Sequence, residues 1–439
     1  MGGRRGGSAK KTVRTTTVPD RAAAGRRRRF ELPRSTSMSG TATALVIGGG
    51  IAGPVVATAL HKAGIEARVY EAYPSPAYTI GSGLALAPNG VAALDVIGAG
   101  DAVRDIAVPI PRMALSVGAK LLSMPVLGDQ PPLQLVDRGE LHRALHERAV
   151  AAGVPVEFGR RLESAEQTAD GVLARFTDGS TATADVLIGA DGIRSTVRGL
   201  IDPAAPGPEY TGMLGFGATV DCAVDIEPDT IVFAYGSRAY YLYWSAGPGR
   251  IGWGANLPSK EYLSLTDARR IPAEHWLEVL RETYGADTPG GQLARATTAD
   301  RLETVGALHI MPPVPHWYRG RMALVGDAVH APSNSSGQGA SLAIESAIEL
   351  ARCLRDIPEP AEAFAAYETL RRARVEGVAA RAAKINHSKT PGPVARRMMQ
   401  WLMPVLARTV MKPEKTVATE QRYRITWDEP VRRTPASAR

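Results

Sequence analysis

The feature that most constrains the fold is a glycine-rich turn at residues 48–53, which directly follows a short apolar run at residues 43–47. Such a run is suited to a buried parallel strand. The turn reads Gly-Gly-Gly-Ile-Ala-Gly and fits the pattern G-x-G-x-x-G. In this pattern the first glycine permits a tight turn, the second lets the backbone approach a pyrophosphate, and the third allows close packing of helix on strand. These three positions are Gly48, Gly50 and Gly53.

The residues after the turn complete a strand–helix–strand unit. A helix is predicted over residues 55–62, with Gly64 as its stop, and a second strand over residues 67–70 leads to Glu71. An acid at this place accepts hydrogen bonds from ribose hydroxyls in dinucleotide-binding folds. The segment therefore predicts a Rossmann-type dinucleotide site. By itself it does not decide between FAD and NAD.

Two later segments also place polar residues directly after short apolar strands. Residues 185–188 lead to Asp191-Gly192, and residues 322–325 lead to Gly326-Asp327. Ligands of open α/β sheets bind at the carboxyl ends of the strands. We therefore expect the carboxylate of Asp327 to bind a ribityl hydroxyl. A second glycine turn follows this segment and opens a long helix at about residues 340–354.

The three motifs, in this order and spacing, resemble those of the single-component (group A) FAD-dependent aromatic hydroxylases over about residues 43–372. The resemblance implies that FAD is bound and that NAD(P)H is a transient co-substrate. No second strand–GxGxxG–helix unit occurs in the sequence, which fits an enzyme that has no separate NAD(P)H domain. The residues that the resemblance places around FAD are Gly48, Gly50, Ile51, Ala52, Gly53, Glu71, Arg138, Leu162, Asp191, Gly326, Asp327, Gly337, Gly339 and Ala340.

The sequence departs from the family pattern at three positions. Asn334 stands where the family often has proline, near the oxygen-reacting edge of the flavin. Ser341 and Ser346 stand where asparagine and aspartate are frequent. Since the neighbouring glycines are intact, we expect FAD binding to survive. Asn334 is a candidate residue of the substrate pocket.

The region from residue 205 to 300 changes to a β-type alternation rich in Tyr, Gly and Trp. It predicts antiparallel strands at residues 231–235, 239–245 and 250–256. In the family that the chain resembles, such a sheet roofs the substrate pocket. Along the second strand Tyr241 and Tyr243 share one face, and Tyr240, Leu242 and Trp244 share the other. We take Tyr241 and Tyr243 as the candidates, although the sequence does not decide which face lines the pocket.

The predicted fold class is α/β: a Rossmann-type FAD-binding domain with an interleaved antiparallel β-sheet substrate domain and C-terminal helices. The expected division is a disordered basic tail at 1–40, an FAD-binding domain at 41–204 and 301–372, a substrate domain at 205–300, and a helical segment with a tail at 373–439. Residues 396–411 are mostly apolar and are interrupted by basic residues. We expect them to form a helix over the pocket mouth or at a subunit contact, with a membrane-surface helix as the alternative.

The distribution of charge argues against a nucleic-acid partner. The net charge is +8, but residues 1–37 alone carry +9, so the remainder carries −1. A nucleic-acid-binding domain would place its basic excess on the folded part. Met38 stands just before the first strand, and we expect residues 1–37 to be an upstream extension rather than a functional arm.

The cysteine count and the hydropathy pattern argue against disulfides, a metal site and a membrane-spanning segment. The two cysteines, Cys222 and Cys353, belong to no CxxC or Cys/His cluster, so we expect neither a disulfide framework nor a metal site. No run of 18 apolar residues occurs, so we expect no integral membrane segment and a cytoplasmic protein.

These observations predict an NAD(P)H-using monooxygenase. It would insert one oxygen atom of O₂ into an aromatic, polyketide-like or other secondary-metabolite substrate, and the resemblance implies a flavin C4a-hydroperoxide as the oxygen donor. No catalytic side chain is assigned, because the cofactor carries the difficult step. His330 is expected to be structural. The alternative is that FAD is a scaffold and the pocket performs a non-redox reaction such as a cyclisation. Oligomeric state is not indicated by the sequence.

Overall fold

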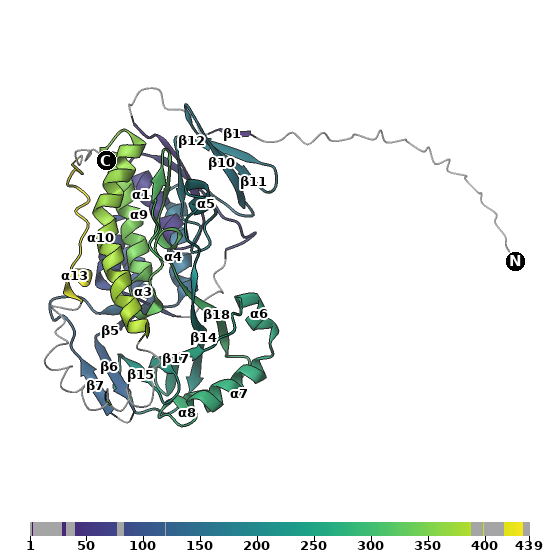
Figure 1. Cartoon of the computed structure of the whole chain (residues 1–439), viewed down its shortest axis with the longest axis vertical. Helices are drawn as coiled ribbons and strands as arrows, with labels where there is room; N and C mark the ends of the chain where they lie inside the picture. The colour runs from purple at the N-terminus through teal and green to yellow at the C-terminus, as the bar shows by residue number, and fades with distance from the viewer. Residues whose placement is uncertain are drawn as a thin grey trace.

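A computed structural model describes residues 40–76, 83–118, 120–387 and 417–432, together with residues 2, 29–31 and 398. The molecule has an upper part, in which helices cover a parallel sheet, and a lower part built on a large antiparallel sheet (Figure 1). This α/β architecture confirms the predicted fold class.

The upper part is built on a six-stranded sheet with the order β19-β20-β13-β2-β3-β9. Strands β20, β13, β2, β3 and β9 pair in parallel, and β19 is antiparallel to β20. Every residue of β2, β13 and β20 is buried, which explains why these segments are continuous apolar runs. The bounds are β2 Thr43–Ile47, β3 Glu66–Tyr70, β9 Val156–Glu157, β13 Val186–Gly189, β19 Tyr318–Arg319 and β20 Met322–Leu324.

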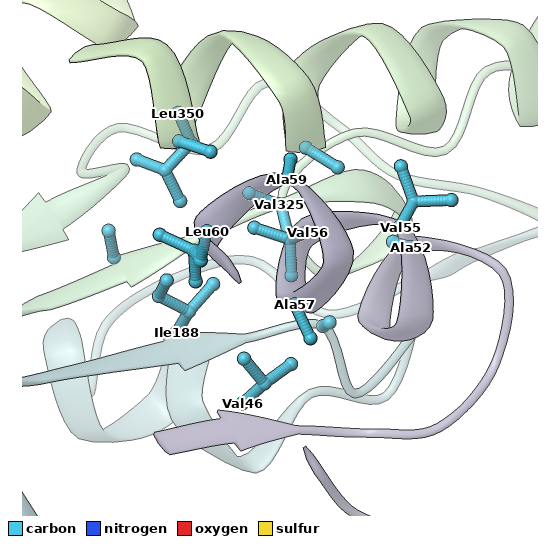
Figure 2. Close-up of a cluster of buried hydrophobic side chains, with 14 of the residues drawn as sticks. Val46, Ala52, Val55, Val56, Ala57, Ala59, Leu60, Ile188, Val325 and Leu350 are labelled. Atoms are coloured by element: carbon cyan, nitrogen blue, oxygen red, sulfur yellow. The ribbon is translucent and has the colours of Figure 1, made fainter. Parts of the chain in front are cut away.

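Helix α1 (Ala52–Lys62) lies between this sheet and the long helix α9 (Gly339–Asp356) (Figure 2). Val46 and Ile188 of the sheet lie on one side of α1, and Leu350 of α9 lies on the other. Residues 52–60 are all buried, so the small and β-branched side chains of α1 fill a gap between two layers. Helix α10 (Pro360–His387) packs on α9 (Figure 1).

The remaining helices and small sheets complete the upper part. The helices are α2 Pro88–Val96, α3 Gly100–Ile106, α4 Arg138–Ala151, α5 Thr196–Ile201 and α13 Ala418–Gln421. A three-stranded sheet contains β4 Leu84–Leu86, β8 Leu133–Val136 and β5 Val108–Ile110. A four-stranded sheet contains β1 Arg29–Glu31, β12 Thr181–Ala184, β11 Gly171–Phe176 and β10 Leu162–Thr168.

Strand β1 differs from the expectation of disorder over residues 1–40. It pairs in parallel with β12, from Arg29↔Thr181 to Glu31↔Thr183. The open edge of β12 offers unpaired backbone groups, and an extended segment of any composition can satisfy them.

The lower part is a seven-stranded sheet with the order β18-β14-β17-β16-β15-β6-β7. Helices α6 Leu265–Arg270, α7 Ala273–Tyr284 and α8 Gly290–Ala296 lie beside this sheet (Figure 1). The strands are β6 Arg112–Val117, β7 Lys120–Met124, β14 Glu209–Asp221, β15 Thr230–Tyr235, β16 Tyr240–Ser245, β17 Arg250–Pro258 and β18 Glu303–Ile310.

This sheet does not respect the expected boundaries at residues 205 and 300. Strands β6 and β7 come from the preceding segment, and β18 comes from the following one. The parallel pair of β6 with β15 joins residues 118 positions apart, as in Arg112↔Thr230. A pairing so distant leaves no local trace in the sequence. Of the segment 396–411, only residue 398 is among the described residues, so its predicted covering role stays a prediction.

Within the described parts of the chain, no helix has both the length and the apolar character needed to cross a membrane.

Candidate active site

The three sequence motifs meet at one edge of the six-stranded sheet. Strands β2, β13 and β20 are neighbours, so their carboxyl ends, and the turns that follow, lie side by side. Backbone hydrogen bonds hold these turns together, from Ala190 N to Ile47 O (2.8 Å) and from Val325 N to Gly189 O (2.9 Å). This edge is where open α/β sheets bind ligands.

The first glycine turn has both the crowding and the open space that its pattern predicts. Gly48 has a φ of +105°, and a Cβ on Gly53 would come 1.8 Å from the carbonyl oxygen of Gly48. These two glycines therefore allow the turn and the helix to pack. A Cβ on Gly50 would meet nothing within 4 Å. Gly50 thus faces open space at the start of α1, where Ile51 and Ala52 begin the helix and backbone N–H groups favour an anion.

Glu71 braces the glycine turn from the end of β3. Its carboxylate accepts hydrogen bonds from Gly49 N (2.6 Å) and Tyr73 N (2.8 Å). The acid is therefore held beside the turn, where the sequence predicts contact with the adenosine ribose. Leu162, predicted to lie at the adenine edge, begins β10 and is only 5% exposed. Arg160 N, just before it, donates to Glu71 O (2.7 Å), which brings this segment beside Glu71.

His142, which was not among the residues expected from the sequence, also contacts the glycine turn. Its Nε2 donates to the carbonyl oxygen of Gly49 at 2.6 Å. His142 lies four residues after Arg138 on α4, so both side chains share one face of the helix. The spacing of these two polar residues was a signal that could have located it.

Asp191 organises the turn after β13. Its carboxylate is half-buried and accepts hydrogen bonds from Ser195 Oγ (2.5 Å) and Val197 N (3.1 Å). Loss of hydration raises the pKa of the Asp191 carboxyl, although these hydrogen bonds oppose the rise. In the described structure this carboxylate therefore fixes the start of α5. Its predicted cofactor role stays a prediction.

Arg198 joins this turn to the next motif. The side chain is 5% exposed, and its guanidinium donates to Ala328 O (2.9 Å) and Ile193 O (2.9 Å). Burial lowers the pKa of Arg198. The guanidinium thus clamps the Asp191 turn against the Gly326-Asp327 turn, a role that no sequence pattern indicated.

The Gly326-Asp327 turn requires glycine for two reasons. Gly326 has a φ of +62°, and a Cβ there would lie 2.9 Å from Ala52 Cβ. The turn therefore packs directly on the start of α1. Burial raises the pKa of the Asp327 carboxyl, and the positive charge of Arg138 opposes that rise. The charge of the exposed Arg138, at the start of α4, therefore acts on the Asp327 carboxyl.

The loop before α9 forms the other end of the site. Residues Asn334–Ser336 form one turn of 3₁₀-helix, and Gly337 follows with a φ of +59°. A Cβ on Gly337 or Gly339 would meet nothing within 4 Å, so these glycines face open space, as Gly50 does. Helix α9 begins at Gly339 and continues through Ala340 for 18 residues. Its first backbone N–H groups lack helical acceptors.

A buried polar network holds this loop from behind. The side-chain amide of Asn89 donates to Gln338 Oε1 (2.9 Å) and to Glu345 Oε1 (2.7 Å). Two of the family departures have partners here: Ser341 Oγ accepts from Ala87 N (3.1 Å), and Ser346 Oγ is hydrogen-bonded to His330 Nε2 (2.9 Å). The serines therefore fit the packing around α9.

The glycines that face open space and the tight turns at the sheet edge fit an extended molecule with a central pyrophosphate, such as FAD. Comparison with known proteins decides the family. Residues 41–382 match the family described as FAD binding domain. The chain is 32% identical over 357 residues to 3-amino-4-hydroxybenzoate 2-monooxygenase of Streptomyces cremeus, covering 77% of this chain and 86% of that protein. It belongs to the FAD-dependent aromatic hydroxylases.

Two more relatives extend the match. The crystal structure of Klebsiella pneumoniae HpxO complexed with FAD and uric acid has a TM-score of 0.75 at 27% identity, and the match covers 86% of this chain and 95% of that one. Aurachin C monooxygenase/isomerase of Stigmatella aurantiaca is 29% identical over 341 residues, which cover 75% of this chain and 85% of that protein. The predicted family, the FAD cofactor and the class of FAD-dependent monooxygenase are confirmed.

In this hydroxylase the two faces of strand β16 have different surroundings. Tyr241 and Tyr243 are 1% and 4% exposed and belong to the apolar cluster formed with α7 and α8. Tyr241 Oη accepts a hydrogen bond from Gly290 N (3.3 Å). These two candidates therefore lie on the side covered by helices, and the structure does not bring them together with Asn334.

The opposite face of β16 is turned toward the FAD-binding part. A Cβ on Gly83 would lie 3.8 Å from the ring of Trp244 and 3.8 Å from Leu135. Leu242 and Trp244 are half-buried on this face. Asn256 of β17 is also on it, because Asn256 pairs with Tyr240, and Asn334 Nδ2 approaches Asn256 Oδ1 at 3.5 Å. The inward face therefore meets both the loop near Gly83 and the loop at Asn334.

His330 is a buried part of the scaffold. It is 4% exposed, its Nε2 is bonded to Ser346, and burial, together with the charge of Arg371, lowers the pKa of His330 to about 3. It is therefore neutral at physiological pH and packs beside Trp317. Among the residues that the structure describes, no group of three or more His, Cys, Asp or Glu side chains is arranged to hold a metal ion.

Proposed function

We propose that this enzyme uses NAD(P)H and O₂ to insert one oxygen atom into an aromatic, polyketide-like or other secondary-metabolite substrate. The observation that carries the proposal is the meeting of three glycine turns at one edge of the parallel sheet. The loop that opens α9 also approaches the inward face of β17, where Asn334 Nδ2 lies 3.5 Å from Asn256 Oδ1. Two relatives, 3-amino-4-hydroxybenzoate 2-monooxygenase and the protein crystallised with FAD and uric acid, support a flat aromatic substrate.

The chemistry that FAD supplies when bound is hydride acceptance from NAD(P)H followed by activation of O₂. The chain itself has to hold the cofactor, orient the substrate and exclude water. Gly48 and Gly53 shape the turn. Gly50, which faces open space, would leave room for the pyrophosphate, and Glu71, held beside the turn by Gly49 N, would bind the ribose. We assign Asp327 and Arg138 to the ribityl and pyrophosphate portions. The remaining predicted contacts, Leu162 and Asp191, belong to the adenine edge and to the turn after β13.

The start of α9 would stabilise negative charge on the cofactor. The backbone N–H groups at Gly339 and Ala340 have no acceptor within the helix, and the helix end carries about half a positive charge. Donors that are already fixed in place cost no reorganisation when charge develops. The network of Asn89, Gln338 and Glu345 keeps this helix end in position.

The first test is anaerobic mixing of the purified holoenzyme with NADPH and then with NADH, while the absorbance of oxidised flavin is followed. We expect the absorbance of oxidised flavin to bleach and to return when air is admitted. We expect NAD(P)H to be oxidised faster in the presence of an accepted substrate. A flavin that stays oxidised with both nucleotides and every candidate substrate would contradict the proposal.

That second outcome would favour FAD as a scaffold for a non-redox reaction such as a cyclisation. The name of one relative, a monooxygenase/isomerase, joins an oxygenation with a rearrangement of the carbon skeleton or its bonds. Product analysis in H₂¹⁸O and in ¹⁸O₂ separates the two candidates, because only the monooxygenase places one atom of ¹⁸O₂ in its product.

A further inference from the structure

A buried carboxamide on the substrate sheet has no assigned role. Asn256 lies in β17 and is 4% exposed. Its cross-strand neighbour is Tyr240, and the next pairs on the same face are Leu242↔Gly254 and Trp244↔Gly252. Asn256 therefore shares the inward face with Leu242 and Trp244, rather than the helix-covered face with Tyr241.

The Nδ2 atom of Asn256 is buried and has no hydrogen-bond partner within the described structure. Leaving a buried N–H group without an acceptor costs about 1–3 kcal/mol. Buried polar groups in folded proteins are nearly always paired, so an unpaired one calls for a specific reason. A bound molecule that supplies the missing acceptor is such a reason.

The position of the amide points to the substrate. Asn334 Nδ2 approaches Asn256 Oδ1 at 3.5 Å, and Asn334 begins the 3₁₀ turn that leads to Gly337. The Asn256 amide group therefore lies where the sheet meets the loop expected at the reactive edge of the flavin. Its Oδ1 faces Asn334, which leaves Nδ2 as the donor that is available.

The surrounding surface specifies the rest of the ligand. On the inward face of β15, β16 and β17 the cross-strand rows contain the apolar or aromatic side chains of Phe233, Leu242 and Trp244, and glycines at 252 and 254. Arg250 is the one charged residue among the inward-facing positions of these three strands; the set is Ile231, Phe233, Tyr235, Tyr240, Leu242, Trp244, Arg250, Gly252, Gly254, Asn256 and Pro258. Arg250 begins β17, six positions before Asn256, and its exposed guanidinium lies beside Asp221. A carboxylate placed beside Asn256 would therefore lose hydration without gaining a nearby cation from these strands.

We propose that Asn256, held by Asn334, donates a hydrogen bond to a neutral carbonyl oxygen of a flat aromatic substrate. The substrate class is thus a ring ketone or lactam, such as a quinolone or pyridone, rather than an aromatic carboxylate. The inference rests on the proposed function, since it names the substrate class of the same site. It separates this chain from a relative whose named substrate, 3-amino-4-hydroxybenzoate, carries a carboxylate.

The test uses two matched probes on the oxidised holoenzyme. 4-Quinolone presents a ring carbonyl, and quinoline-4-carboxylate presents a carboxylate on the same bicycle. Binding is followed by the change in the flavin absorption spectrum. We expect 4-quinolone to bind at least tenfold more tightly. Equal affinity, tighter binding of the carboxylate, or no response to 4-quinolone at its solubility limit would overturn the assignment.

Variants locate the contact. We expect Asn256→Leu, which keeps the branched shape and the number of side-chain heavy atoms, to weaken 4-quinolone binding about tenfold, and Asn334→Ala to weaken it less. The control is Thr230→Val, which removes a buried hydroxyl from the opposite face of the same sheet, since Thr230 precedes the inward-facing Ile231 in β15. It should leave the affinity unchanged. A wild-type affinity in Asn256→Leu, with full FAD content, would refute the role of the amide.

Anaerobic reduction of the flavin by NAD(P)H tests the proposed redox function separately from the role of Asn256. If Asn256→Leu is reduced like the wild type but binds 4-quinolone weakly, both the proposed function and the role of Asn256 stand. If neither protein is reduced while the probe affinities still differ, the proposed redox function fails and the carbonyl site remains.

Discussion

The guanidinium of Arg371 and the carboxylate of Glu345 form an ion pair at 2.6 Å although neither side chain is exposed to solvent. The pair joins α10 to α9. Glu345 also accepts from Asn89, whose amide donates to Gln338 at the start of α9. A charge in α10 therefore supports the loop at the start of α9. Arg374 Nη2 reaches Glu345 as well, at 2.9 Å.

Replacing Arg371 should damage both stability and cofactor binding. We expect Arg371→Met to lower the free energy of unfolding by about 3 kcal/mol, because it leaves a buried carboxylate with less compensation. Urea unfolding of the apoprotein measures this loss, and titration with FAD measures the affinity. Arg238→Met is the control: Arg238 pairs with Glu282 on the surface, at 60% and 77% side-chain exposure. It should change stability by less than about 1 kcal/mol.

Glycine substitutions in the first turn should separate folding from cofactor binding. In Gly53→Ala the new Cβ would lie 1.8 Å from Gly48 O, so we expect a misfolded or strongly destabilised protein without FAD. In Gly50→Ala the Cβ enters open space, so the apoprotein should keep its melting temperature while FAD affinity falls at least tenfold. Gly199→Ala, at an exposed position of α5 where a Cβ would meet nothing within 4 Å, should retain both properties. Normal FAD affinity in Gly50→Ala would show that the cofactor does not approach this backbone.

The parts of the site that the sequence predicted are those encoded by neighbouring residues. The turn at Gly48–Gly53, the acid at Glu71 and the start of α9 each combine a conformational requirement with a chemical one over a few positions. Because each of these motifs is read from a few consecutive residues, the sequence alone predicts where it lies relative to its strand or helix. In the same way, the apolar run at residues 322–325 predicted that Asp327 follows the end of a strand.

The parts that the sequence missed depend on distant pairs. Arg198 donates to Ala328 O across 130 positions, and Asn256 accepts from Asn334 across 78. Arg198 and Asn256 have no distinctive sequence neighbourhood, because a buried guanidinium and a buried amide acquire their roles only when the distant partner packs against them. The choice of Tyr241 and Tyr243 shows a related limit: alternation separates two faces of a strand, but only the packing of α7 and α8 tells which face they cover.

The low pKa of His330 predicts a dependence of stability on acidity. The unfolded chain protonates this residue near pH 6.5, while burial keeps it neutral in the folded protein down to about pH 3. Between these values the unfolded state binds one more proton, so the free energy of unfolding falls as the pH is lowered through this window, by up to about 1.4 kcal/mol per pH unit.

The variant His330→Gln should lose this component. We expect its melting temperature, measured at saturating FAD between pH 7 and pH 5, to fall less steeply with pH than that of the wild type. Exposed His275 offers the matched substitution His275→Gln, which should follow the wild type. Identical slopes for all three proteins would mean that His330 is not buried in neutral form.

The assignment of the two faces of β16 can be tested with one substitution on each. Trp244→Ala removes a half-buried ring from the inward face, where it lies against Gly252 and near Gly83. We expect it to weaken 4-quinolone binding by about 1–2 kcal/mol, because a flat ligand loses an aromatic contact. Tyr241→Phe removes the acceptor for Gly290 N on the helix-covered face. It should cost about 1 kcal/mol of stability and leave probe affinity unchanged. The reverse result, with affinity sensitive to Tyr241 and indifferent to Trp244, would return the pocket to the face first inferred from the sequence.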